Sequence, residues 1–200
     1  MLENNILSKI DKLSLKSKYV KKYPSDPIKI IKGVGNITGE INKQHVDFLK
    51  KTNGASILDY CFWGIKNSNL FPRNIYDEMS NVWYKNPLTS LSFWCIAGNS
   101  AGEYFGYIPQ KDSKGNHFIA YLNKISSSEI HLVSSSFNIF MSKFLDEVSI
   151  KISDDEESLD IDYSFFLDSH KIAKDDDELM IYLDKKPPKI NLIEYHSRTY

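Results

Sequence analysis

The clearest alternation of core-forming and polar positions lies between Ile41 and Gly54. Residues that can face a core recur there every three or four positions, which places them on one side of an α-helix. That side consists of Ile41, His45, Phe48, Leu49 and Thr52. Asn53-Gly54 follows, and glycine readily takes the left-handed conformation that ends helices because it has no Cβ. We therefore predict a helix that ends at Asn53, with Gly54 left-handed.

The segments after this helix have the composition of β-strands. Runs rich in β-branched and aromatic residues are separated by turn-forming residues, and two of the runs flank the glycine-rich turn 98–102 as a hairpin. The predicted strands are residues 57–65, 91–97, 104–108, 117–122 and 129–133. The first of them is apolar on both faces, as a buried strand is. We predict a mostly antiparallel sheet of about five or six strands.

The most regular hydrophobic stripe in the chain comes next. It consists of Phe137, Phe140, Met141, Phe144, Leu145 and Val148, which share one face of a helix that one of Ser134, Ser135 and Ser136 can cap. Further helices are predicted at Ile6 to Leu13 and from Pro72 to Trp83, whereas 28–31 and 179–183 have the composition of short strands. The fold class is therefore α+β in a single domain, with helices packed on one side of the sheet.

Two prolines, Pro24 and Pro27, end the N-terminal helical pattern, and the regular pattern weakens again beyond Val148. We expect an N-terminal helical appendage over residues 1–37, a central domain over 38–148 and an acidic C-terminal extension over 149–200 that is partly packed. Lys186-Pro187-Pro188 ends the ordered pattern, and the last dozen residues have the character of a tail.

Composition limits the classes of protein that fit. Of the 200 residues, 42% are hydrophobic and 26% are charged, and no apolar run approaches the roughly 20 residues of a membrane span. Charged residues interrupt the N-terminal segment, so we expect no secretory signal and a cytoplasmic location. Cys61 and Cys95 lie in apolar strand-like runs, where cysteine usually behaves as a small hydrophobe.

Charge is unevenly distributed, although the net charge is only −1. Lysines dominate from Lys9 to Lys32, and carboxylates dominate from Asp154 to Glu178. Such runs are usually solvated faces, but either could be an interaction surface. The balance gives no overall attraction to nucleic acid, and we predict no direct nucleic-acid binding and no membrane binding.

One motif in the chain is associated with catalysis in other proteins. Gly98-Asn99-Ser100-Ala101-Gly102 matches G-x-S-x-G, the nucleophile elbow of serine hydrolases. An elbow needs a helix directly after the serine, whereas a strand is predicted here, so the glycines are better explained as a hairpin turn. A hydrolase that uses Ser100 with His117 or His131 and Asp112 remains a distant alternative. The histidines lack metal-site spacing, and we predict no catalytic, metal or cofactor residues.

The segment INKQHVDFLKKTNG resembles the signature L-P-x-x-Y-x-x-F-L-x-x-x-N-G of the SUKH superfamily. Ile41, Phe48, Leu49, Asn53 and Gly54 match the pattern, whereas Asn42 replaces the usual proline and His45 the usual tyrosine. The hairpin segment 96–108 and the strand-to-helix segment 130–145 are also similar to the family. The resemblance covers residues 38–148.

This resemblance implies an α+β fold and a non-catalytic role. SUKH proteins are chiefly bacterial immunity proteins that neutralise polymorphic toxins, and fungal members are regulatory scaffolds in cell-wall synthesis. The first hypothesis is a cytosolic immunity protein, monomeric or weakly dimeric, whose partner is a protein toxin domain such as a basic nuclease-like one. The alternative is a regulatory or scaffold adaptor without a toxin.

Two surfaces are candidates for holding that partner. The first is the acidic stretch, because a toxin that attacks nucleic acid is often basic where its substrate binds. Its candidate residues are Asp154, Asp155, Glu156, Glu157, Asp175, Asp176, Asp177 and Glu178. The second is the concave side of the sheet that the resemblance implies, near Trp63, Glu103 and Tyr104.

Overall fold

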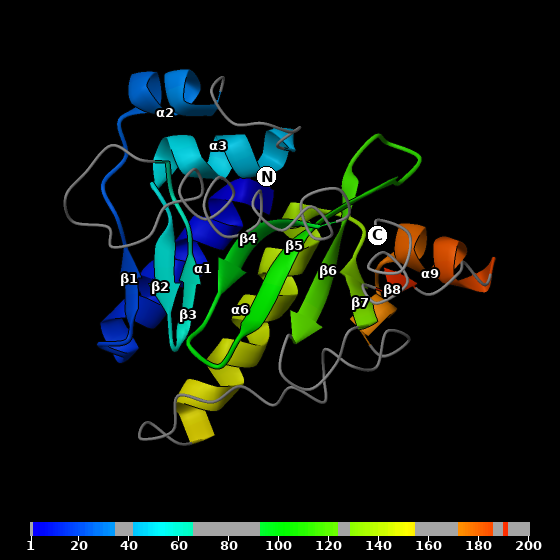
Figure 1. Ribbon diagram of the computed structural model, residues 1–200. Coiled ribbons are helices and arrows are strands. Elements are labelled where there is room, and N and C mark those ends of the chain that lie inside the picture. Colours follow the sequence, from blue (N-terminus) through cyan, green and yellow to red (C-terminus); the bar gives the residue numbers. More distant parts are fainter. Residues whose placement is uncertain are drawn as a thin grey trace.

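A meander of antiparallel strands forms the centre of the protein (Figure 1). The computed structural model describes residues 2–34, 42–65, 93–123, 129–154, 172–185 and 190–191. Its strands are β1 (Val20–Lys22), β2 (Ala55–Ile57), β3 (Tyr60–Phe62), β4 (Trp94–Gly98), β5 (Glu103–Lys111), β6 (His117–Asn123), β7 (Glu129–Ser134) and β8 (Ile190–Asn191). Each pairs with the next, so the spatial order equals the sequence order. The predicted single α+β domain is confirmed, and the described residues form eight strands where about five or six were expected.

Two long helices cover one face of this sheet, α1 (Leu2–Lys16) and α6 (Phe137–Asp154), and they lie side by side (Figure 1). Both had been predicted from their hydrophobic stripes. Ser136 caps α6, since its carbonyl oxygen accepts the Phe140 amide at 3.0 Å and its hydroxyl lies 3.5 Å from the Ile139 amide nitrogen. The helix thus begins where the serine run indicated.

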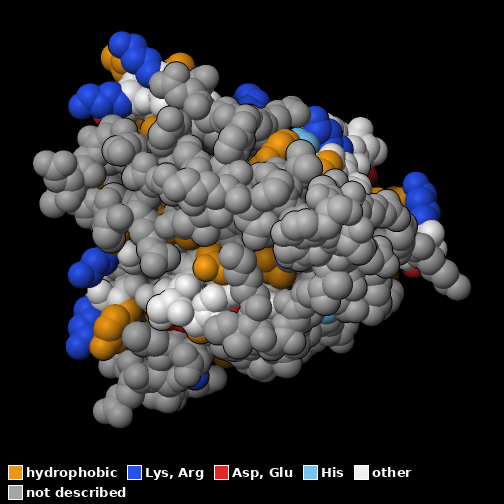
Figure 2. Space-filling view, in the orientation of Figure 1, with side chains coloured by type: hydrophobic (Ala, Val, Ile, Leu, Met, Phe, Trp, Pro, Cys, Tyr) orange, Lys and Arg blue, Asp and Glu red, His pale blue; other side chains and the backbone are white. Residues whose placement is uncertain are grey.

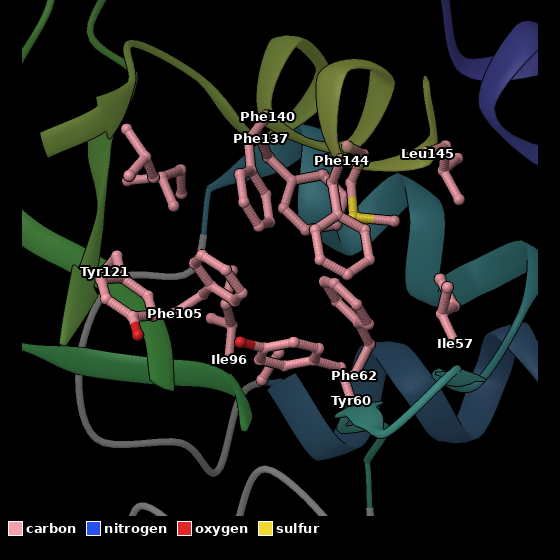
Figure 3. Packing of buried hydrophobic residues seen from close by; sticks show 14 of the residues in the cluster. Ile57, Tyr60, Phe62, Ile96, Phe105, Tyr121, Phe137, Phe140, Phe144 and Leu145 are labelled. Carbon is pink, nitrogen blue, oxygen red and sulfur yellow. The ribbon is translucent and has the colours of Figure 1, made fainter. Parts of the chain in front are cut away.

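Aromatic side chains fill the space between α6 and the sheet (Figure 3). The Phe144 ring lies edge-on to Phe62 from β3, with 5.2 Å between centroids, and edge-on to Tyr60 at 5.6 Å. Phe140 contacts Phe105 from β5 at 4.8 Å. Edge-to-face packing of this kind adds to the hydrophobic gain of burial. The core therefore lies where the stripe on residues 137–148 predicted it.

The signature helix is α3 (Lys43–Lys51), which lies across one end of the sheet with α2 (Pro27–Val34) packed on it (Figure 1). It ends at Lys51, two residues before the predicted Asn53, because Thr52 is already extended at φ −144° and ψ 125°. Gly54 has a φ of +88°, which confirms the predicted left-handed glycine. Its role is to turn the chain into β2 after an extended residue, so it is not a direct helix cap.

Asn53 has a structural role that the motif alone did not reveal. Its buried side chain donates from Nδ2 to the Ile65 carbonyl at 3.1 Å, and its Oδ1 accepts the Ile65 amide at 2.7 Å. A Cβ on Gly64 would come within 2.2 Å of the Asn53 carbonyl oxygen. Asn53 therefore fixes the end of the β3 segment against the turn after α3.

Three sequence predictions about strands were wrong, namely those for residues 57–65, 28–31 and 179–183. The predicted strand 57–65 is the hairpin of β2 and β3, which turns at Leu58 with a φ of +56°. The predicted strand 28–31 is helix α2, which begins at Pro27 after Asp26 accepts the Ile28 amide at 3.1 Å. A proline in the first helical position and an aspartate before it favour a helix start.

The predicted strand 179–183 is helix α9 (Asp177–Asp184), at the β7 and β8 end of the sheet (Figure 1). Asp176 caps this helix by accepting the Leu179 amide at 3.3 Å, and Asp177 and Glu178 place negative charge in its first turn. Negative charge there interacts favourably with the positive end of the helix dipole. The short apolar run is therefore helical.

The remaining predictions fall largely outside the described residues. The expected helix from Pro72 to Trp83 lies there, as does the tail apart from β8, which pairs with β7. Within the described part of the chain, none of the helices has the length and apolar character needed to cross a membrane.

Candidate partner-binding surfaces

The glycine-rich turn between β4 and β5 is organised by Asn99. Its Oδ1 accepts the backbone amides of Ala101 and Glu103, each at 3.1 Å, and its amide nitrogen donates to Asp59 at 2.8 Å. Side chains of this type commonly replace backbone groups in tight turns. Ser100 is left exposed at the tip of the turn.

Glu103 is buried beside this turn, with 3% of its surface exposed. Its Oε1 accepts the Tyr121 hydroxyl at 2.8 Å, and its Oε2 accepts the Tyr60 hydroxyl at 3.1 Å. Asn99 and Asn123 also donate to the carboxylate, at 2.6 and 3.2 Å. Burial raises the pKa of Tyr121, and the neighbouring Glu103 carboxylate raises that pKa further. Four donors thus stabilise one internal carboxylate, which ties β3, β5 and β6 together.

The candidate residues of the sheet concavity do not share one face. Successive side chains of a strand point to opposite faces, and Glu103 lies on the α6 side with Phe105. Tyr104 points the other way and is partly exposed. Its ring packs against the ring of Trp63, with 6.4 Å between the two centroids. Trp63 is fully buried at 0% exposure. The structure therefore brings Trp63 and Tyr104 together and places Glu103 inside the core.

Ser100 and His117 lie at opposite ends of the sheet. Ser100 precedes Glu103, the first residue of β5, whereas His117 pairs with Lys111, the last residue of that strand. The first and last of the nine residues of β5 are separated by eight steps of about 3.3 Å, about 26 Å in all, which is far beyond hydrogen-bond reach. His117 is buried and held by the Ile108 carbonyl at 2.8 Å. The strand after Ser100 is β5, so the serine is in a hairpin turn.

The acids of the α9 region have different roles in the structure. Asp176 is 1% exposed, and its Oδ2 accepts the Ser135 amide at 2.8 Å and the Ser134 hydroxyl at 3.1 Å. Glu178 accepts the Ser113 hydroxyl and amide, which hold its pKa below the usual value. Asp175 and Asp177 are exposed.

Lysines also surround this end of α9. Lys174 and Lys185 are exposed, and Lys114 reaches Glu178 at 4.0 Å. The region is thus of mixed charge, because each exposed acid has a lysine nearby in sequence or in space. Of the other predicted acids, Asp154 is the last residue of α6, and Asp155, Glu156 and Glu157 lie outside the described residues.

A groove between α1 and α6 was not predicted from the sequence. It has a volume of about 420 Å³. Its lining residues are Lys9, Lys12, Leu13, Leu15, Lys16, Leu145, Asp146 and Ser149. Figure 2 also shows lysine side chains along the edge of the molecule where β1 follows α1. The lysine-rich stretch that begins at Lys9 was the feature of the sequence that could have indicated this groove. Its periodicity did not show that these lysines would lie beside α6.

The residues that depart from the family signature fit the structure. Asn42 caps α3, its side chain accepting the Gln44 amide at 2.8 Å. His45 is buried among aromatic rings, and its ring stacks on Phe137 with 4.5 Å between centroids. Each replacement therefore serves its position: asparagine starts the helix, and histidine packs as a flat ring.

The protein is an α+β domain. Its antiparallel sheet follows the order of the sequence, helices cover one face of that sheet, and the signature helix ends before Asn53-Gly54. The chain belongs to the SMI1/KNR4 family (SUKH-1), whose family model matches residues 40–143. Proteins of this family are generally non-catalytic immunity or regulatory proteins. Comparison with individual curated proteins gave no match.

Proposed function

We propose that this protein is an immunity protein that binds a cognate polymorphic toxin and neutralises it without catalysis. The observation that carries the proposal is membership of the SMI1/KNR4 family over residues 40–143. A fold alone does not define a function, so the proposal needs the support of individual sites.

The polar groups near the one catalytic motif support a non-catalytic role. Ser100 is separated from His117 by the length of β5. Glu103, the nearest buried carboxylate to this turn in the sequence, already accepts four hydrogen bonds within the core. A general base must reach the proton that it removes, and His117 does not reach Ser100.

We place the toxin contact on the acidic residues that begin at the end of α6. The α9 acids are the weaker part of the acidic surface, because Asp176 is buried and exposed lysines lie close to the others. Asp154, Asp155, Glu156 and Glu157 are consecutive and contain no lysine. A dense run of one sign attracts a basic partner over a longer range and speeds encounter. The sheet surface near Trp63 and Tyr104 is the competing location.

Co-expression tests the function directly. A toxin domain encoded beside this gene is expressed alone and then together with this protein, and growth is measured. We expect killing by the toxin alone and full growth with both. Phe144→Asp, which places a charge in the core, is the control for folding and should abolish rescue. Killing that persists in the presence of the folded wild-type protein would refute the proposal and favour a regulatory adaptor.

The same assay separates the hydrolase alternative. Ser100 is exposed in a turn, so Ser100→Ala should leave folding and rescue unchanged. Loss of rescue in a folded Ser100→Ala variant would instead support a nucleophilic role for this serine.

Association kinetics test the location of the contact. Neutralising Asp154, Asp155, Glu156 and Glu157 together should slow association with the toxin at low salt and flatten its salt dependence. Asp175→Asn with Asp177→Asn is the comparison, and we expect a smaller effect because lysines lie nearby. An unchanged association rate in the first variant would place the toxin elsewhere, while rescue by the wild type would still support the function.

A further inference from the structure

The groove between α1 and α6 combines an apolar floor with a basic rim. Leu13 and Leu145 are buried at its base, whereas Leu15 is 88% exposed at its side. Lys9, Lys12 and Lys16 are spaced three and then four residues apart, so they share one face of α1. The groove is thus amphipathic, and it leaves a large apolar side chain in water.

The lysines of the groove differ in how they are neutralised. Lys9 donates to Asp146 at 2.7 and 2.9 Å and to the Ser142 hydroxyl at 3.0 Å, which joins the two helices. Lys12 and Lys16 form no ion pair within the described residues. Like charges one turn apart on a helix destabilise it slightly. The helix dipole favours Lys16, which lies in the last turn of α1, but it does not account for Lys12, whereas an acidic ligand would use both lysines.

The shape and charges of the groove select among acidic ligands. A membrane surface is flat, and it would bring its phosphates against the Asp146 carboxylate inside the groove. Nucleic-acid affinity comes from many neutralised phosphates, whereas of the three lysines that line the groove two, Lys12 and Lys16, lack an ion pair within the described part of the chain. A protein segment can place single carboxylates at those lysines and an apolar side chain on Leu15. A volume of about 420 Å³ accommodates a few side chains, within the range of about 300–1,000 Å³ common for ligand sites.

We infer that the α1 and α6 groove is a docking site for an acidic amphipathic segment of a protein partner, bound as a helix in a groove. This site goes beyond the proposed function, because a basic toxin would be attracted to the acidic residues and repelled by these lysines. Lys12 and Lys16 contact carboxylates of the segment, and Leu15 packs against its apolar face. The protein thereby has two contact surfaces of opposite charge.

Fluorescence anisotropy with the full chain tests this site. The probe is a labelled synthetic peptide in which pairs of glutamate and leucine alternate, which forms an apolar helical face edged by carboxylates. We expect saturable binding that weakens with salt. Lys12→Glu with Lys16→Glu should weaken it about tenfold or more, because two attractions become repulsions. Lys174→Glu with Lys185→Glu changes the charge equally at exposed positions that flank α9 and should leave binding unchanged.

A second variant protects the test against loss of folding. Leu15→Ser removes only an exposed apolar side chain, so thermal unfolding should be unchanged while peptide binding weakens. The inference is overturned if the wild-type chain does not bind the peptide. It is equally overturned if Lys174→Glu with Lys185→Glu loses as much affinity as Lys12→Glu with Lys16→Glu. It is also overturned if phosphatidylserine vesicles or duplex RNA compete better than unlabelled peptide. None of these results affects toxin rescue, which tests the proposed function separately.

Discussion

The buried histidine of α3 should make the stability of this protein depend on pH above the range in which carboxylates titrate. His45 is 1% exposed and packs against Phe137, Phe48 and Tyr107, and its Nδ1 has no hydrogen-bond partner among the residues that the structure describes. Burial among these rings disfavours the imidazolium cation and lowers the pKa of His45 from 6.5 to about 3. The folded protein therefore holds His45 neutral, whereas the unfolded chain binds a proton below pH 6.5.

The sign and size of the effect follow from proton linkage. Between the two pKa values the unfolded state binds more protons, so the free energy of unfolding rises with pH. It is highest above pH 6.5 and falls by about 1.4 kcal/mol for each unit below that value, until the folded pKa is reached. Between pH 7 and pH 5 the expected loss from His45 is about 2 kcal/mol.

Urea denaturation at pH 7 and pH 5 measures this loss. His45→Phe keeps a flat ring in the same position without a titrating group, so its free energy of unfolding should change with pH by about 2 kcal/mol less than that of the wild type. The carboxylates whose pKa values are lowered, such as Asp47, affect stability mainly below pH 4 and are the same in both proteins. Equal pH dependence in wild type and variant would refute the reasoning.

Three further substitutions test the packing and the turns, each measured by urea denaturation at pH 7. Gly54→Val should cost about 1–2 kcal/mol or more, because Gly54 has a φ of +88° that a β-branched residue resists, and an unchanged midpoint would contradict this. Phe144→Ala should cost about 3–5 kcal/mol because the ring is fully buried, whereas the control Ile150→Ala at an exposed position should cost little. Asp176→Ala should cost about 2–3 kcal/mol, since it removes a helix cap and leaves the buried Ser135 amide without its acceptor. Asp177→Ala is its control, and equal losses in the two variants would show that Asp176 acts only through its charge.

The elements with long periodic patterns were predictable from the sequence. The stripe of α6 extends over more than three turns, and only a helix places all its members on one face. Short apolar runs gave no such distinction. Leu179 to Leu183 has five consecutive residues that suit a strand as well as a helix, and Asp176 decides the outcome by capping α9. The turn at Leu58 was missed because it contains neither glycine nor asparagine, the usual residues of a two-residue hairpin turn.

The candidate surfaces were harder to predict because they depend on what packs around each side chain. Glu103 and Tyr104 are adjacent in sequence, yet one carboxylate lies in the core and the neighbouring ring is partly exposed. The choice of face depends on Tyr60 and Tyr121, which come from other strands. The groove between α1 and α6 likewise needs two helices whose contacting residues, Lys9 and Asp146, are separated by 137 positions. A local hydrophobic pattern does not show which residues far apart in the sequence will come into contact.

The sequential order of the strands also determines how the chain can fold. Each of the seven pairings between the described strands joins successive described strands, so from β4 through β7 each new strand can add to the one before it during synthesis. The pairing of α1 with α6 cannot form until residue 146 and its neighbours have been made. Loop-closure entropy makes such distant contacts slow to form. Helix α1 is therefore made long before α6, and the part of its apolar stripe that packs on α6 is open to solvent until α6 exists.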